Sequence, residues 1–301
     1  MNPQLDSATL QAFAQVADSG SFSIAAEKLF LTQSAVSKRI AHLEEQVDCR
    51  LFDRIGRRIT LTEAGRTLLP QAQKILHALE DAALSLQNLS GEVAGPLSLA
   101  ASHHISLHRL PPVLRDFSTR YPGVELKLSF DESEVAYDHV LNGELELALI
   151  TLAPSNDPRI HAEVLWIDSL HYVVAKDHPL AALEKPDLEA LTRYPALLPA
   201  PNTFTHQLVQ SQLSEQGLKP NLGMSTNYLD TIRMMVRIGL GWSLLPATMI
   251  DEGLTTLPIA SEPIPRPLGV IYHRDRTLSN AGRELVALLR DYKQHASLDP
   301  N

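Results

Sequence analysis

Four residues that could read DNA bases recur at helical spacing near residue 35. Gln33 and Ser37 are four residues apart, as are Ser34 and Lys38, so a helix would present all four on one face. A glutamine can pair bidentately with adenine, a lysine can donate to guanine or phosphate, and short serines let the backbone enter a major groove. The row therefore suits base recognition. The alternative is a solvent-exposed helix start that is rich in capping residues.

Two amphipathic helical patterns would position this row. Ser21 and Thr32 are the candidate N-caps of the two helices, and only a few residues connect them. This short connection predicts a sharp crossing, as in a helix-turn-helix. Each helix has an apolar stripe that can face the other: Phe22, Ala25, Ala26 and Leu29 in the first, and Val36, Ile40, Leu43 and Val47 in the second.

An arginine-rich segment follows the two helices. The stretch "LFDRIGRRITLTEAG" alternates through a glycine-centred turn at residues 55–57, which predicts a small β-hairpin with arginines near its tip. A hairpin at this point of the chain would form a wing. Residues 50–66 carry five arginines against two acidic residues, which suits contact with phosphates, although so short a charge run can also be a solvated face.

Residues 63–89 predict one long helix, in which Pro70 should cause a bend or a local break. Apolar residues recur along it at alternating spacings of four and three, as in a heptad seam. Such a seam needs a partner, and a second copy of the chain is the simplest one; packing on the chain's own core is the alternative. The seam consists of Leu68, Ala72, Ile75, Leu79, Ala82, Leu86 and Leu89.

Composition limits the remaining possibilities. The 301 residues suffice for two or three domains, and the formal net charge is −9. Residues 1–89 carry 9 basic against 10 acidic residues, so the acidity lies in the C-terminal part and does not oppose DNA binding by the N-terminal part. The single cysteine, Cys49, excludes an internal disulfide, and we expect it to be packed as a small apolar residue. The absence of a long apolar run or a signal-like start predicts a cytoplasmic protein with no membrane partner.

After a small hinge near residues 90–96, strand and helix patterns alternate, which predicts two small parallel-sheet subdomains. Ligands of open α/β sheets collect at the carboxyl ends of strands. The polar positions there predict a small-molecule site between the subdomains, with an anionic metabolite as the first candidate, although loop histidines are often only solvated and Thr203 could simply cap a helix. The predicted site comprises Ser102, His103, His104, Thr151, Asn202, Thr203 and Phe204.

Enzymatic activity is not supported by the sequence. No HExxH, GxSxG, phosphate-binding loop or Cys/His ligand spacing occurs, so we expect no catalytic residue, no bound metal and no cofactor. A solute-binding protein for transport is a second alternative, because the C-terminal part alone would fit one. The N-terminal helix-turn-helix pattern and the lack of a signal-like start argue against it.

The chain resembles the LysR-type transcriptional regulators. The segments "AAEKL", "TQSAVSKRIAHLE", "LFDR" and "LTEAG" match the family pattern in order and spacing, and "KDHPLA" and "RIGLGWSLLP" extend the match. One departure is Val47-Asp48, where the family usually has Leu-Gly. The resemblance implies base contacts at Gln33, Ser34, Ser37 and Lys38, phosphate contacts at Ser21 and Ser23, and wing contacts at Arg54, Arg57 and Arg58.

The resemblance also implies the domain plan. The expected fold is α/β with an α-rich N-terminal module: a winged helix-turn-helix at 1–62, a linker and dimerisation helix at 63–90, and a periplasmic-binding-protein-like effector domain at 91–301. Its subdomain one would comprise 91–165 and 266–301, and its subdomain two 166–265. The expected function is sequence-specific transcriptional regulation controlled by a small-molecule co-inducer. The expected partners are double-stranded promoter DNA, further copies of the chain in a homodimer or homotetramer, and RNA polymerase as a further candidate.

Overall fold

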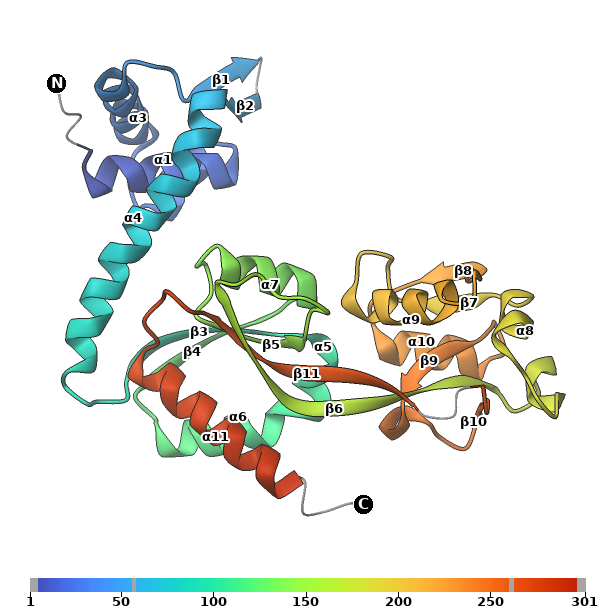
Figure 1. Cartoon of the computed structure of the whole chain (residues 1–301). Helices are drawn as coiled ribbons and strands as arrows, with labels where there is room; N and C mark the ends of the chain where they lie inside the picture. Colours follow the sequence, from blue (N-terminus) through green and yellow to red (C-terminus); the bar gives the residue numbers. More distant parts are fainter. Residues whose placement is uncertain (1–4, 56–57, 260–262, 297–301) are drawn as a thin grey trace. The chain divides into compact units, whose positions relative to one another are not determined.

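The structure is a computed structural model that describes residues 5–55, 58–259 and 263–296. The chain divides into two units, Met1–Ser90 and Gly91–Asn301 (Figure 1). Each unit has its own hydrophobic core. The elements of each unit are therefore described separately.

Three helices and a hairpin form the body of the first unit (Figure 1). The helices are α1 (Ser7–Ser19), α2 (Phe22–Lys28) and α3 (Gln33–Val47), and they enclose a core that includes Phe13 and Leu43. Side chains at the three N-caps, Asp6, Ser21 and Thr32, accept a hydrogen bond from a first-turn N–H, which satisfies a donor that the helix itself leaves unpaired. The two predicted N-caps and the helix-turn-helix are thus confirmed.

Helix α3 ends in a left-handed residue at the position where the family usually has glycine. Asp48 has φ +51° and ψ +36°, and its N–H donates to the carbonyl of Glu45 at 3.4 Å. Aspartate tolerates this conformation better than most side chains, so the helix keeps its C-terminal turn without glycine. The neighbouring Cys49 is exposed, which shows that the prediction of a packed cysteine is wrong.

The predicted wing is confirmed as the antiparallel hairpin of β1 (Phe52–Ile55) and β2 (Arg58–Leu61). The two turn residues at its tip, 56 and 57, lie outside the described residues. The carboxylate of Glu44 on α3 accepts hydrogen bonds from the N–H groups of Leu51 at 2.7 Å and Phe52 at 3.3 Å. This contact fixes the start of the wing to the C-terminal part of α3.

The first unit depends on a glycine at the start of the long helix α4 (Glu63–Asn88). A Cβ atom at Gly65 would lie 2.2 Å from the carbonyl oxygen of Leu51 and 2.8 Å from the Leu61 side chain. We expect Gly65→Ala to destabilise this unit by about 1–3 kcal/mol, because backbone atoms would have to move. Faster amide hydrogen exchange in α3 of the Gly65→Ala variant would show this destabilisation. Ala64→Gly, beside it, is the control and should change exchange much less; equal exchange in Gly65→Ala and the parent would contradict the prediction.

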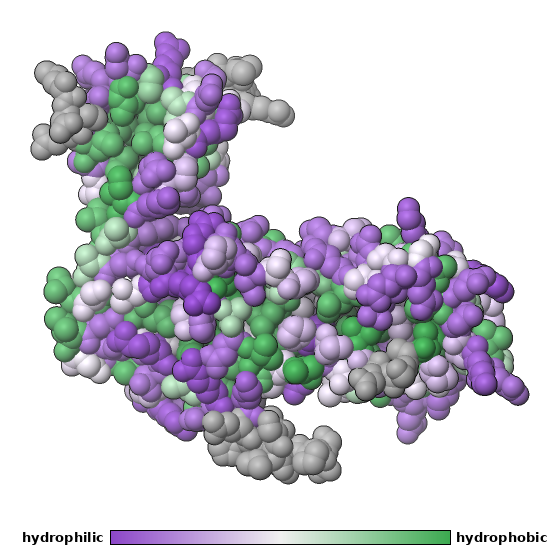
Figure 2. All heavy atoms as spheres, viewed as in Figure 1, coloured by the Kyte–Doolittle hydropathy of each residue, from purple (hydrophilic) through white to green (hydrophobic). Residues whose placement is uncertain are grey.

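Helix α4 is one uninterrupted helix of 26 residues that contains Pro70, so of the two predicted outcomes, a bend or a local break, the local break is wrong. Leu68 and Ala72 pack against the core of their own unit, and Ala72 is fully buried there. The alternative of packing on the chain's own core is therefore correct for Ala72, and Leu68, which stays partly exposed, packs on that core as well. The remaining seam residues are exposed, and Figure 2 shows hydrophobic side chains along the helix: Ile75, Leu79, Ala82, Leu86 and Leu89.

The second unit is built on a seven-stranded sheet with the strand order β10-β6-β11-β5-β3-β4, in which β9 also pairs with β6. Strands β3 (Gly95–Ala101), β4 (Val124–Phe130) and β5 (Leu147–Thr151) are parallel. The long strands β6 (Ile160–Ala175) and β11 (Ile264–His273) are antiparallel to each other and run through both subdomains (Figure 1). The prediction of purely parallel sheets is therefore wrong: the sheet is mixed, because the chain crosses between the subdomains twice in opposite directions.

Helices cover both faces of the sheet in subdomain one. Helices α6 (Leu110–Arg120) and α11 (Asn280–Ala296) cover one face, and α7 (Ser133–Leu141) covers the other (Figure 1). The alternation along β3 explains this arrangement, since Leu97 and Leu99 join the first core and Ala100 the second. The short helix α5 (His103–His108) follows β3 directly.

Subdomain two surrounds the far halves of β6 and β11. It contains β9 (Ser243–Pro246), β10 (Leu254–Thr256) and a separate parallel pair, β7 (Ala196–Leu198) and β8 (Leu222–Ser225). Helices α8 (Leu188–Thr192) and α9 (Phe204–Ser214) pack with one core, and α10 (Leu229–Arg237) packs with another. Two 3₁₀ turns, Pro179–Ala182 and Ala247–Met249, complete the unit.

Candidate DNA-binding surface and effector site

The row predicted to read bases lies on the solvent side of α3. Gln33, Ser34 and Lys38 are exposed and Ser37 is partly exposed, while the apolar stripe of the same helix is buried in the core. The Ser34 hydroxyl lies 3.0 Å from that of Thr32, so it is partly committed to the helix cap. The arrangement leaves the first turns of α3 open to a groove of DNA.

The two serines predicted to contact phosphates, Ser21 and Ser23, differ in exposure and in hydrogen bonding. Ser23 is exposed at the start of α2, whereas the Ser21 hydroxyl caps that helix by accepting from the N–H of Ile24 at 3.4 Å. The wing positions are not tested by the structure: Arg57 lies outside the described residues, and so do the side chains of Arg54 and Arg58.

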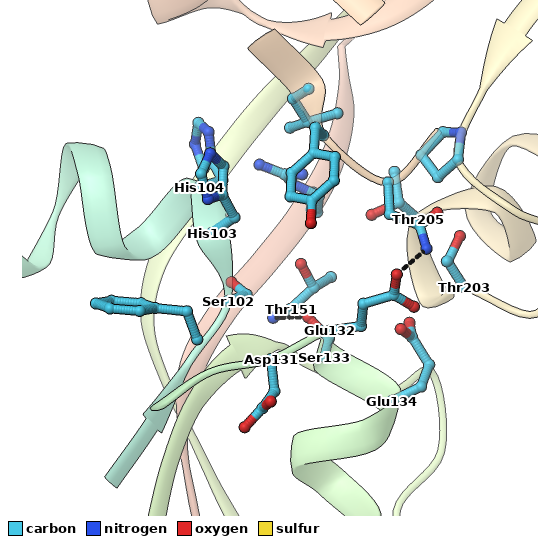
Figure 3. A pocket seen from close by; sticks show the side chains of 16 residues that line it. Ser102, His103, His104, Asp131, Glu132, Ser133, Glu134, Thr151, Thr203 and Thr205 are labelled. Atoms are coloured by element: carbon cyan, nitrogen blue, oxygen red, sulfur yellow. Dashed lines mark hydrogen bonds between the residues drawn. The ribbon is translucent and has the colours of Figure 1, made fainter. Parts of the chain in front are cut away.

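In the second unit, five of the seven predicted effector residues line one cavity of about 160 Å³ between the two subdomains (Figure 3): Ser102, His103, His104, Thr151 and Thr203. They arrive from the carboxyl ends of β3 and β5 and from the start of α9. Strand ends of the same parallel sheet meet at one edge, which is why residues separated by about 50 positions converge here.

The other two predicted effector residues do not line this cavity. Asn202 is exposed beside it. The Phe204 ring packs against the Tyr137 ring with centroids 6.0 Å apart. Thr203 does line the cavity, but its hydroxyl donates to the carbonyl of Ala200 at 2.7 Å and accepts from the N–H of His206, so it acts mainly as the N-cap of α9.

A buried charged cluster lies at one end of the cavity and was missed in the sequence. The side chains of Asp168 on β6 and Arg266 on β11 are 1% and 3% exposed and form an ion pair. Arg109 donates to the second Asp168 oxygen at 3.1 Å, and His104 Nε2 lies 3.1 Å from Asp168. The available signal was weak: Asp168 and Arg266 are charged residues within predicted strands, and such residues are rarely buried unless paired, but β6 also contains other polar residues such as Glu163.

Burial shifts the titration of this cluster. Burial raises the pKa of Asp168, but His104 and Arg266 outweigh it, so the pKa of this carboxyl lies well below its usual range. Burial lowers the pKa of His104 despite the nearby carboxylate. We infer that Asp168 is ionised and His104 neutral at pH 7. With Arg109 and Arg266 charged, the cluster carries one excess positive charge.

Two carboxylates that were also missed border the cavity from the other side. Glu132 and Glu134 lie at the start of α7, and their carboxyl groups point toward subdomain two in Figure 3. Glu134 accepts from the N–H of Phe204 at 2.6 Å, and Glu132 accepts from the side-chain amide of Asn227. Burial and the charge of Glu132 raise the pKa of Glu134. The strand-end rule could have found them, because both follow β4 closely.

Comparisons with known proteins agree with this architecture. Residues 8–66 match the family described as "Bacterial regulatory helix-turn-helix protein, lysR family", and residues 90–294 match "LysR substrate binding domain". The chain is 63% identical over 108 residues to an HTH-type transcriptional regulator in the ibpB-leuC intergenic region of Azotobacter vinelandii, covering 36% of this chain and 75% of that protein. It is 33% identical over 282 residues to the Escherichia coli HTH-type transcriptional regulator YeiE, and this match covers 92% of this chain and 94% of that protein.

A solved structure shares the fold over nearly the whole chain. A full-length, singly substituted OxyR from Pseudomonas aeruginosa has a TM-score of 0.70 at 22% identity and covers 97% of this chain and 95% of that one. Within the described residues, no helix is long and apolar enough to cross a membrane, and no three His, Cys, Asp or Glu side chains are grouped as a metal site would require. The match of two consecutive family domains shows that the chain belongs to the LysR family of DNA-binding, effector-responsive transcriptional regulators and is not an enzyme.

Proposed function

We propose that this regulator reads promoter DNA through the first turns of α3 and senses a small molecule in the cavity between its subdomains. The observation that carries the DNA-binding half is the solvent-facing polar row of α3, opposite the buried Val36, Ile40 and Leu43. The row consists of Gln33, Ser34, Ser37 and Lys38. Ser23 on α2 and the wing arginines would hold the DNA backbone, since such contacts position a protein without reading sequence.

The effector half of the proposal is supported by the cavity. Ser102 and Thr151 place hydroxyls at its wall, and His104 and Arg266 contribute buried nitrogen atoms. A bound molecule would contact both subdomains and would therefore favour one relative placement of them over another. We propose that this shift alters how the DNA-binding units of an oligomer are held, which is a coupling between two sites.

Two further partners, other copies of the chain and RNA polymerase, complete the proposal. Exposed apolar residues on α4 support pairing with a second copy, and four copies would follow if a further surface is shared. RNA polymerase is a proposed partner, because a regulator bound at a promoter acts beside it. We place the protein in the cytoplasm, where promoter DNA is accessible, and we propose no cofactor beyond the effector.

The test is fluorescence anisotropy with the DNA upstream of the protein's own gene beside an unrelated duplex of equal length. We expect Lys38→Ala and Ser37→Ala each to weaken binding to the upstream DNA by about 1–3 kcal/mol, because each removes a groove contact. Steep loss of binding with salt is also expected. Lys185→Ala removes an exposed lysine from the other unit and is the matched control. Unchanged DNA binding in both α3 variants would contradict the assignment of the recognition surface.

A further inference from the structure

The cavity proposed as the effector site has two ends of opposite charge. One end is lined by Arg266 and His104, which belong to a cluster with Asp168 and Arg109 that carries one excess positive charge. The other end holds Glu132 and Glu134. In Figure 3 these two carboxyl groups lie on the side of the cavity opposite His103 and His104, whereas the Asp131 carboxyl points away.

The positive end presents nitrogen atoms that are buried but not hydrogen bonded within the described residues. Arg266 Nε and His104 Nδ1 have no hydrogen-bond partner there, and each residue is more than nine-tenths buried and lines the cavity. Unsatisfied buried polar atoms of this kind are uncommon and destabilising. A ligand carboxylate at this end could accept from Arg266 and from the nearby Ser102 and Thr151 hydroxyls.

The negative end lacks a cationic partner among the described residues. Glu134 accepts from a backbone N–H and Glu132 from a neutral side-chain amide. Both carboxylates therefore have a hydrogen-bond donor, but neither donor carries a positive charge that would balance theirs. The N-terminus of α9 offsets about half of one charge. The remaining like charges repel, which favours a ligand that brings a positive charge between them.

Two exposed aromatic rings also line the cavity. Phe130 and Tyr228 both line the cavity and are more than half exposed, and the Tyr228 ring lies edge-on to His103 with centroids 5.1 Å apart. The face of an aromatic ring attracts an ammonium or guanidinium group. Because the Tyr228 ring lies beside His103, on the side opposite Glu132 and Glu134, the preference for a cation at the glutamate end rests on the two carboxylates and not on this ring.

We propose that the effector is a small zwitterion of the amino-acid type, whose carboxylate binds at the Arg266 end and whose ammonium group binds between Glu132 and Glu134. The inference rests on the proposed function, because it takes the cavity to be the effector site. It narrows the ligand class: a metabolite with anionic groups at both ends would place one of them against two carboxylates.

The experiment compares compounds that differ only in charge. Straight-chain ω-amino acids of two to six carbons are tested beside the α,ω-dicarboxylates and diamines of the same lengths, for example 4-aminobutyrate, succinate and putrescine. Binding to the full-length protein is measured by isothermal titration calorimetry. We expect at least one amino acid to bind about tenfold or more tightly than the dicarboxylate of equal length.

The variants separate charge from shape. Glu132→Gln and Glu134→Gln keep an oxygen that can accept from Asn227 and from the N–H of Phe204, so the contact is retained while the charge is lost. We expect each to reduce or reverse the preference for the amino acid. Asp131→Asn is the matched control, and we expect it to leave the preference unchanged because this carboxyl points away from the cavity.

The outcomes are distinct. Tightest binding by a dicarboxylate, no binding by any amino acid, or an unchanged preference in both glutamine variants would overturn the proposal. If a dicarboxylate binds and Ser102→Ala with Thr151→Val abolishes its binding, the cavity remains the effector site and only the ligand class is wrong. If those changes leave its binding intact, the assigned site itself is wrong. DNA binding measured on the same preparations tests the DNA half of the function independently.

Discussion

Replacing Asp168 by asparagine is expected to destabilise the effector unit by about 3–5 kcal/mol. The substitution preserves the size of the side chain but leaves the guanidinium of Arg266, which is 3% exposed, without a countercharge. Urea unfolding followed by tryptophan fluorescence measures this directly, because both tryptophans, Trp166 and Trp242, lie in this unit.

Two comparisons separate this effect from general loss of an ion pair. Asp116→Asn removes the partner of Arg120 on the surface and should cost less than about 1 kcal/mol. The double change Asp168→Leu with Arg266→Met should restore much of the stability, because a buried pair can be replaced by apolar side chains. Equal stability of Asp168→Asn and the parent would show that Arg266 is not held as a buried charge.

The same cluster predicts a pH dependence. Because the folded state depresses the pKa of Asp168, its contribution is present above the unfolded value near pH 4 and is lost as the pH falls toward the lower folded value. The stability difference between the parent and Asp168→Asn should therefore shrink under acid conditions. A difference that grew with acidity would contradict the assigned ionisation.

Glutamate at Leu79 and Leu86 is expected to separate the oligomer. These residues are 52% and 70% exposed on α4 and form part of the remaining seam, so their burial must come from outside the unit. Burying one leucine contributes about 1.5–3 kcal/mol, and each symmetric pair involves two copies. We expect the dimer dissociation constant to rise by about 100-fold or more.

Sedimentation equilibrium checks this expectation, with DNA binding as the second readout. A monomer would contact one half-site and lose most of its affinity for a two-half-site operator. Asn88→Glu introduces the same charge on the opposite side of α4 and is the control. If the doubly substituted protein sediments like the parent, the seam is not the dimer interface.

Local pattern was sufficient to predict the DNA-binding unit. Its helices, caps and hairpin depend on contacts between residues close in sequence. Examples are the hydrogen bonds that the Ser21 and Thr32 side chains accept from first-turn N–H groups of their helices. The departure at Asp48 could be seen in the sequence, but two structural facts could not: the left-handed turn persists with aspartate, and Cys49 is exposed. Exposure of one side chain depends on how the whole chain packs around it.

The long helix shows the same limit. Its seam was evident from spacing alone, yet the spacing does not distinguish a face that meets a second copy from one that meets the chain's own core. Only the folded unit shows that Ala72 is buried beside α1 and its neighbours while Leu86 is not. The heptad pattern is the same in both cases because both partners present apolar surface.

At the proposed effector site, the strand ends that line the cavity could be predicted from the sequence. Which charged side chains are buried beside the cavity followed only from the tertiary structure. The strand-end rule located Ser102 and Thr151, because parallel strands place their carboxyl ends together. The pairing of Asp168 with Arg266 joins residues 98 positions apart and arises only where β6 and β11 run side by side. The sequence by itself therefore determined the family, the helix-turn-helix and the strand ends that line the cavity. The folded chain decided which charges face that cavity, because burial and pairing depend on contacts distant in sequence.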